Sequence, residues 1–207
     1  MNNKPFILKA AEAAGHKIFE TGDYDLNIIS VRKENGTPDA FDDILFVCYK
    51  INGLWQQESF KITTDPGVYH LNKPGRVEGT AILKAGQYQG VYKIGHHRGK
   101  YQALVQTGGR VTVWRDDNRD EFLDMNKTQD GYFGINVHRA HSSRELETVG
   151  KYSAGCQVFR RSQDLDRLLS LCKRQIQEHP NWKQQFTYTL LEESELKPKK
   201  STRKKKA

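Results

Sequence analysis

A cysteine behind Ser-Ala-Gly and a histidine at the end of an apolar run are the residues of this chain best suited to do chemistry. Residues 134–159 read GINVHRAHSSRELETVGKYSAGCQVF, with His138 eighteen positions before Cys156. A cysteine becomes a nucleophile when a nearby base takes its proton or stabilises its thiolate. Gly155 would let a substrate approach the main chain, and the amides of Ala154, Gly155 and Cys156 would hold an oxyanion. The segment therefore predicts a site for acyl transfer.

The residues around this pair predict how it is positioned. INVH, at residues 135–138, alternates between apolar and polar side chains, which predicts a strand that ends at His138 and holds the ring at the edge of a cleft. Residues 139–155 are mostly polar and long enough to loop back, so a second strand starting near Cys156 is expected beside the first. Histidine comes first and close here, whereas papain-like enzymes place the cysteine well before the histidine.

Most of the remaining chain predicts strands. Asn52-Gly53 separates two apolar runs and is a strong hairpin signal, because both residues tolerate positive φ. His70, in GVYHL, is expected on a strand with its ring hydrogen-bonded. Strands are expected at residues 26–32, 44–51, 54–62, 80–86, 90–95, 101–107, 110–115, 133–138, 156–159 and 186–191.

Two peripheral helices are expected beside these strands. Residues 4–20 carry apolar side chains at helical spacing, and the second helix is expected at about residues 162–179. One face of the second helix carries Leu165, Leu168, Leu169, Cys172 and Ile176. The predicted organisation is an N-terminal helix segment (1–22), a single catalytic-type β domain (23–191) and a disordered basic tail (192–207). The expected fold class is mainly β with peripheral α-helices.

Basic charge is concentrated at the C-terminus. Lys and Arg number 33 and Asp and Glu 25, but residues 197–207 hold seven basic side chains and no acidic one, which leaves 26 basic and 25 acidic residues in the rest. A body with so little net charge is not expected to attract nucleic acid, and no sequence-specific nucleic-acid binding is predicted. The tail is expected either to keep the protein soluble or to bind an anionic polymer, such as nucleic acid or a cell-wall glycopolymer.

The cysteines and histidines predict no metal site and no cofactor. Cys48, Cys156 and Cys172 are odd in number and have no close pair, which argues against a disulfide framework and a four-cysteine zinc site. Cys48 and Cys172 lie in apolar patterns and are expected in the core. His138 and His141 form a His-x-x-His pair, but no third ligand is evident.

The segment resembles the catalytic motif of the L,D-transpeptidase (YkuD-type) family, in which a histidine at the end of a strand precedes Ser/Thr-His-Gly-Cys. His138, Ser153, Gly155 and Cys156 match that motif, and Ala154 stands where the family has its second histidine. The resemblance covers about residues 40–160, although only the motif is specific. It implies an L,D-transpeptidase-like β-sandwich or barrel in which Cys156 is the nucleophile and His138 the base.

The resemblance also bears on the residues that would hold a substrate. The family often carries Arg or Asn just after the cysteine, whereas this chain has Gln157-Val158. The Gly-rich residues 74–99 are expected to form a lid over the site, with Tyr88 and Tyr92 available to cover it. The candidate substrate-binding residues are Arg139 and Arg160, either of which would replace the missing arginine, and His96, His97 and Tyr92 of the expected lid.

The resemblance implies a cysteine acyl-transfer enzyme that acts on peptidoglycan stem peptides, as an L,D-peptidase or an L,D-transpeptidase. The alternative is a non-catalytic cell-wall-binding or structural module on the same scaffold, which Ala154 favours and the His138–Cys156 pair disfavours. The N-terminus predicts no signal peptide and no membrane span, so retention in the cytoplasm is expected. Peptidoglycan lies outside the membrane, which favours a phage-encoded lysis or virion-associated protein that meets the bacterial wall after lysis or as part of a virion.

Overall fold

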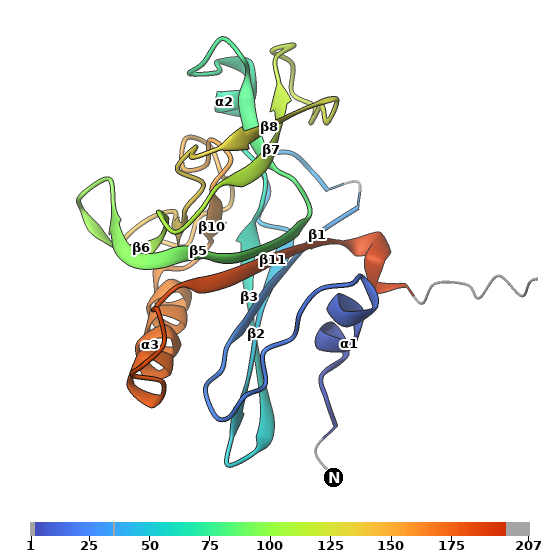
Figure 1. Cartoon of the computed structure of the whole chain (residues 1–207). Coiled ribbons are helices and arrows are strands. Elements are labelled where there is room, and N and C mark those ends of the chain that lie inside the picture. The colour runs from blue at the N-terminus through green and yellow to red at the C-terminus, as the bar shows by residue number, and fades with distance from the viewer. Residues whose placement is uncertain (1–2, 35, 198–207) are drawn as a thin grey trace, which may run out of the picture.

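Strands build most of the chain, as its short apolar runs predict. The computed structural model describes residues 3–34 and 36–197, in which eleven strands and three α-helices are found (Figure 1). Eight strands close a barrel in the order β1-β11-β5-β6-β9-β10-β3-β2, and β4-β7-β8 form a separate three-stranded sheet. The expected mainly β fold class with peripheral helices is confirmed.

The barrel strands are β1 (Asn27–Arg32), β2 (Asp43–Ile51), β3 (Leu54–Thr63), β5 (Gly86–His97), β6 (Tyr101–Gln106), β9 (Val137–Arg139), β10 (Gln157–Phe159) and β11 (Phe186–Glu192). The small sheet consists of β4 (Thr80–Leu83), β7 (Val111–Asp116) and β8 (Lys127–Gly131). The helices are α1 (Phe6–Ala13), α2 (Val68–Asn72) and α3 (Ser162–Glu178), and a 3₁₀ helix, η1, follows β11 at Glu193–Leu196. Among the described strands, β1 pairs with β11 and β9 with β10 in parallel, and the other pairs are antiparallel.

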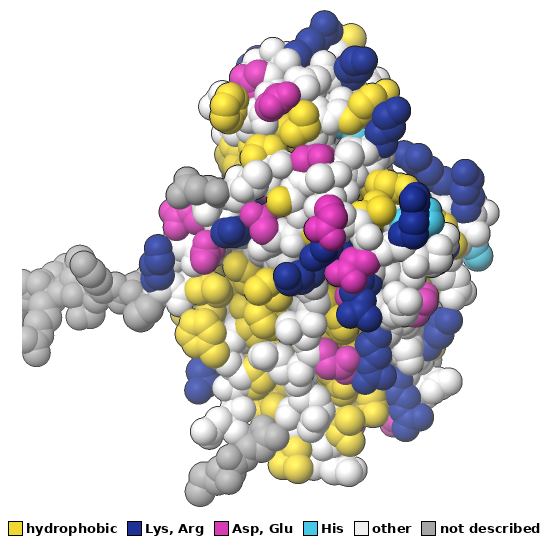
Figure 2. Space-filling view, turned by 180° about the vertical axis from the view of Figure 1, so that it is seen from behind, with side chains coloured by type: hydrophobic (Ala, Val, Ile, Leu, Met, Phe, Trp, Pro, Cys, Tyr) yellow, Lys and Arg dark blue, Asp and Glu magenta, His cyan; other side chains and the backbone are white. Residues whose placement is uncertain are grey.

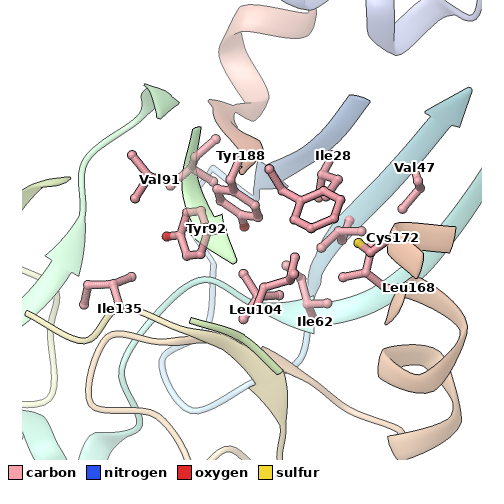
Figure 3. Close-up of a cluster of buried hydrophobic side chains, with 14 of the residues drawn as sticks. Ile28, Val47, Ile62, Val91, Tyr92, Leu104, Ile135, Leu168, Cys172 and Tyr188 are labelled. Carbon is pink, nitrogen blue, oxygen red and sulfur yellow. The ribbon is translucent and has the colours of Figure 1, made fainter. Parts of the chain in front are cut away.

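The inside of the barrel is filled by apolar side chains from its strands and from α3. Tyr92 and Tyr188 lie in its centre with ring centroids 5.6 Å apart, and both are fully buried (Figure 3). Leu168 and Cys172 of α3 approach Val47 and Ile62 from one end of the barrel (Figure 3). The predicted apolar face of this helix is confirmed, because Leu165, Leu168, Leu169 and Cys172 are all buried in this core.

The hairpin between β2 and β3 forms where Asn52-Gly53 predicts it. Asn52 and Gly53 have φ values of 50° and 74°, which is the backbone conformation that a tight turn between antiparallel strands requires. The Asp23 carboxylate accepts hydrogen bonds from both of their amides. This turn fixes the register of β2 and β3, from Asp43 opposite Ile62 to Ile51 opposite Leu54.

The N-terminal helix is shorter than its sequence predicts. It ends at Ala13 instead of residue 20, because Gly15 adopts a φ of 90° and breaks the helical backbone. The amide of His16 donates to the carbonyl of Ala11, and that of Gly15 donates to the carbonyl of Glu12, so the end is capped by the main chain. Residues 16–20 then run without regular structure.

Three further elements were not expected. His70 lies in the short helix α2 and not on a strand, although its ring does have a partner, with Nε2 3.2 Å from the Lys151 carbonyl oxygen. The strand β8 is polar and lacks apolar alternation, so its sequence gives no strand signal. The 3₁₀ helix η1 occupies residues 193–196 of the segment expected to be disordered, and residues 198–207 of that segment lie outside the described residues.

Helix α1 packs beside η1 on the outside of the barrel. The groove between them, of about 470 Å³, is lined by Phe6, Ala10, Ala14 and Leu196 among others. Hydrophobic side chains gather on this side of the molecule when it is seen from behind (Figure 2). None of the described helices is long and apolar enough to cross a membrane.

Candidate active site

The parallel strands β9 and β10 bring the histidine and the cysteine to one face. Val158 lies opposite His138 and Phe159 opposite Arg139 in this pair. Phe159 points into the barrel core, so by alternation Val158 and His138 point to the other face. Cys156, one residue before β10, packs with Val158 in a second apolar cluster on that face. The predicted loop between two adjacent strands is therefore confirmed, and the strands are parallel.

Hydrogen bonds fix the orientation and the tautomer of the His138 ring. Its Nδ1 lies 2.8 Å from the carbonyl oxygen of Arg139 and 3.3 Å from the Tyr101 hydroxyl oxygen. A carbonyl oxygen only accepts, so Nδ1 carries the proton. The Tyr101 hydroxyl donates to the same carbonyl, at 3.1 Å. The other ring nitrogen, Nε2, is therefore left with a free lone pair and is the basic atom of the ring.

His97 stacks on His138. The two ring centroids are 4.0 Å apart with an interplanar angle of 24°. The side-chain amide of Asn136 donates to Nδ1 of His97, at 3.1 Å, and its oxygen accepts from the backbone amide of Gln106, which fixes which way the amide faces. Burial, followed by the nearby His97, lowers the pKa of His138 to about 3. The ring is therefore neutral at pH 7.

The Cys156 thiol is half-buried and neutral. Its Sγ donates to the carbonyl oxygen of Gly134, at 3.3 Å. Burial raises the pKa of Cys156 above its ordinary value, while the backbone amide of Asn136 and the charge of Arg98 oppose this rise. The resting site therefore contains a thiol and a neutral imidazole and not a thiolate-imidazolium pair. Any nucleophilic attack by this thiol would therefore require proton transfer at the same time.

Gly155 and Ser153 shape the turn before the cysteine. Gly155 has a φ of 108°, and a Cβ at this position would overlap the Ala81 carbonyl oxygen of β4, so only glycine fits. The Gly155 amide donates to Ser153 Oγ, at 3.2 Å, and the buried Ser153 hydroxyl donates to the Cys156 carbonyl, at 2.9 Å. Ser153 therefore has a structural position in this conformation.

The bond to Ser153 changes the expected anion pocket. The Gly155 amide has a partner, so it is not free to hold an oxyanion as the sequence predicts. We find no acceptor among the described residues for the amides of Ala154 and Cys156. Two of the three expected donors therefore remain available.

The expected substrate-binding residues are separated by the fold. Arg139 places its guanidinium over the Tyr101 ring, 4.3 Å from the centroid, and lines a pocket of about 480 Å³ between β6 and α3. Arg160 is held by Glu145 and Glu147, at 3.3 and 2.9 Å. Of the two histidines expected in the cleft, His97 contacts His138, whereas His96 alternates with His97 along β5 and is exposed.

The lid expected at residues 74–99 is wrong. Residues 86–97 form the barrel strand β5, and Tyr92 is fully buried inside the barrel, so it has no surface to offer a substrate. Tyr88 donates its hydroxyl to the carbonyl oxygens of Lys84 and Thr112 and so connects β5 to the small sheet. The sequence predicts a strand at residues 90–95 but not the rest of β5, because the glycines of this strand resemble loop signals.

The sequence also gives little sign of three residues that complete the site. Tyr101 and Asn136 position the two rings through the hydrogen bonds described above. Arg98, exposed at the turn between β5 and β6 with a φ of 51°, lowers the pKa of both His138 and Cys156 by its charge. Arg98-Gly99 is a sequence signal for a hairpin between residues 95 and 101. The effect of Arg98 on Cys156 has no such signal, because it depends on the closure of the barrel.

The described residues contain no group of three or more His, Cys, Asp or Glu side chains arranged to hold a metal ion. His141 uses its ring to accept hydrogen bonds from the amides of Ser143 and Arg144. Comparisons with protein-family models, curated proteins and solved structures find no match for this chain.

Proposed function

We propose that the protein is a cysteine acyl-transfer enzyme that acts on peptidoglycan stem peptides, as an L,D-peptidase or an L,D-transpeptidase. The observation that carries this proposal is the fixed His138 tautomer, with Nδ1–H on the Arg139 carbonyl and a basic Nε2, on the same face of β9 and β10 as the Cys156 thiol. The substrate class rests on the resemblance of His138, Ser153, Gly155 and Cys156 to the L,D-transpeptidase motif.

In the proposed reaction Nε2 of His138 takes the thiol proton while Sγ of Cys156 attacks the carbonyl carbon of the diamino acid at the third stem position. A C–S bond forms, and the carbonyl electron pair moves to oxygen, where the amides of Ala154 and Cys156 stabilise it. When the C–N bond breaks, the leaving amine takes the proton from Nε2. Water or an acceptor amine then attacks the thioester and gives its proton to Nε2, and the thiolate that leaves recovers this proton.

The lowered pKa makes His138 a weak base in the resting site, so the proposed proton transfer depends on the charge that develops on the substrate. The difference between the His138 pKa of about 3 and the ordinary value corresponds to roughly 5 kcal/mol against a charged ring. This free energy disfavours a standing ion pair, and the oxyanion that develops during attack supplies a negative charge that compensates the imidazolium. We favour hydrolysis over cross-linking, because Arg160 is already paired with two carboxylates and residues 86–97 of the expected lid belong to the barrel strand β5 instead.

The test is incubation with purified peptidoglycan, followed by mass analysis of the fragments. We expect shortened or separated stem peptides from the unaltered protein and none from Cys156→Ala. Cys48→Ala is the matched control, because it removes a buried thiol on β2, away from β9 and β10. Dimers joined between two diamino acids, or exchange of the terminal D-amino acid, would replace hydrolysis by transpeptidation. The absence of any product would contradict an enzyme.

One observation favours a second function, that of a non-catalytic cell-wall-binding module. The raised pKa of Cys156, together with Ala154 in place of the family's histidine, is what a scaffold without catalytic activity would show. Such a module would sediment with peptidoglycan without changing its fragments. Cys156→Ala would then bind as well as the unaltered protein. Under either function the protein would meet the bacterial wall as a phage-encoded lysis or virion-associated protein.

A further inference from the structure

A cationic pocket lies against the residues that precede Cys156. It has a volume of about 220 Å³ and is formed where α2, β4 and β7 meet the turn before β10. No acidic side chain lines it. The side chains that matter here are those of His70, Arg76, Ala81, Arg115, Phe133 and Ala154.

Arg115 of β7 is the buried cation of this pocket. Only 6% of the residue is exposed, and its guanidinium lies 4.6 Å from the centre of the Phe133 ring. Its Nε donates to Gln129 Oε1, at 2.8 Å, and its Nη1 donates to the Gly79 carbonyl, at 3.1 Å. Nη2 is buried and has no hydrogen-bond partner among the described residues. Buried polar groups are nearly always paired, so this nitrogen lacks an acceptor that a ligand would supply.

The charge of Arg115 is not neutralised either. No carboxylate forms an ion pair with it among the described residues, and burial, followed by the like charge of Arg76, lowers the pKa of Arg115. Glu78 opposes this effect but does not reach the guanidinium as an ion-pair partner. An unpaired buried cation is costly in a protein that binds nothing there. A bound anion would remove both deficits.

The pocket adjoins the nucleophile on two sides. Ala154 precedes Gly155 and Cys156 in the chain, and Ala81 makes the close approach that only glycine at position 155 permits. Phe133 precedes Gly134, whose carbonyl oxygen lies 3.3 Å from Cys156 Sγ. The pocket therefore borders the turn that carries Cys156, on the side of β4 and Phe133.

We propose that the Arg115 pocket binds a carboxylate of the acyl donor and so selects peptides that carry a free carboxylate next to the carbonyl under attack. The inference rests on the proposed function for the identity of the donor, and it names the part of the donor that is recognised. Nη2 of Arg115 supplies the directed hydrogen bond, because guanidinium groups form short, charge-assisted bonds with carboxylates. Arg76, exposed at the rim, adds positive charge without burial.

Alkylation of Cys156 tests the pocket without any need for turnover. The probes are bromoacetyl-D-alanine and its carboxamide, and the measured quantity is the ratio of their rates at Cys156. We expect Arg115→Gln to lower this carboxylate-to-carboxamide ratio by roughly tenfold, and Arg76→Gln by two- to threefold. Arg110→Gln is the matched control, because this exposed arginine precedes the same strand and donates to the Asp130 carbonyl outside the pocket.

Arg76→Gln keeps the test decisive if Arg115→Gln does not fold, since Arg76 is exposed. A ratio unchanged in the variants that fold would overturn the pocket assignment. Stem peptides separate this failure from failure of the proposed function. If free and amidated peptides are cleaved equally well, the enzyme stands and the pocket is refuted. If no peptide is cleaved but the alkylation ratio falls as expected, the pocket stands and the proposed function is refuted.

Discussion

Replacing Gly155 by alanine should be far more damaging than the same change in an open turn. Gly155 has a φ of 108°, which costs a non-glycine residue about 1–3 kcal/mol, and the added Cβ would overlap the Ala81 carbonyl oxygen of β4. To relieve this overlap, β4 and the turn must move apart. A main-chain movement of this kind at an overpacked site costs about 1–3 kcal/mol more. We therefore expect Gly155→Ala to lower the free energy of unfolding by roughly 3–5 kcal/mol.

Gly53→Ala supplies the control for this experiment. Gly53 has a φ of 74° and nothing within 4 Å of an added Cβ, so only the backbone term applies, about 1 kcal/mol. Thermal unfolding followed by circular dichroism should show a Tm lowered by roughly 6–20 °C in Gly155→Ala and about 2–4 °C in Gly53→Ala. Equal losses in the two variants would refute the close approach of the turn to β4, and with it the wall that Ala81 gives to the Arg115 pocket.

Two further predictions concern the thiols and a buried ion cluster. Iodoacetamide should label Cys156 at a rate that keeps rising as the pH passes 8, because burial raises the pKa of this thiol. It should label Cys48 far more slowly, because burial raises the pKa of Cys48 to about 12. A rate plateau for Cys156 between pH 5 and 7 would instead indicate a standing thiolate-imidazolium pair. Arg32→Met should lower the free energy of unfolding, measured in urea, by about 3–5 kcal/mol. Arg32 is buried against Asp65 at 2.9 Å and Glu192 at 3.1 Å, so its loss leaves these two carboxylates unpaired. A loss below about 1 kcal/mol would contradict the role of this ion cluster in stability.

Much of the barrel is predictable from local sequence, because each signal depends on neighbouring residues. Asn52-Gly53 gives the β2–β3 hairpin, and the apolar face of α3 gives its packing against the barrel. The failures have local causes too. The polar strand β8 carries no alternation, and it is held by its pairing with β7, from Val111 opposite Gly131 to Arg115 opposite Lys127. Pairing of this kind depends on the partner strand and cannot be read from the segment itself.

The site was predictable only as far as its chemistry lies in one segment. His138, Ser153, Gly155 and Cys156 lie within that segment, and the order of residue types indicates the proposed base and the proposed nucleophile. The stacking of His97 on His138 requires β5, β6 and β9 to lie side by side, and nothing near His97 in the sequence indicates this. The protonation states of His138 and Cys156 cannot be read from the sequence either, because burial is the largest cause of both pKa changes.

Charge shows most directly why composition is a poor guide to what the body of this protein binds. With 26 basic and 25 acidic residues outside the tail, the body has almost no net charge to attract an anion. The fold nevertheless divides these charges unevenly: carboxylates accompany Arg32 and Arg160, while Arg115 has no carboxylate partner among the described residues. A site for an anion needs one desolvated cation without a partner, and an average over the chain does not report it. The small sheet creates this site by carrying Arg115 on β7 to the turn before Cys156, and the neutral body then limits the attraction to ligands that fit the pocket.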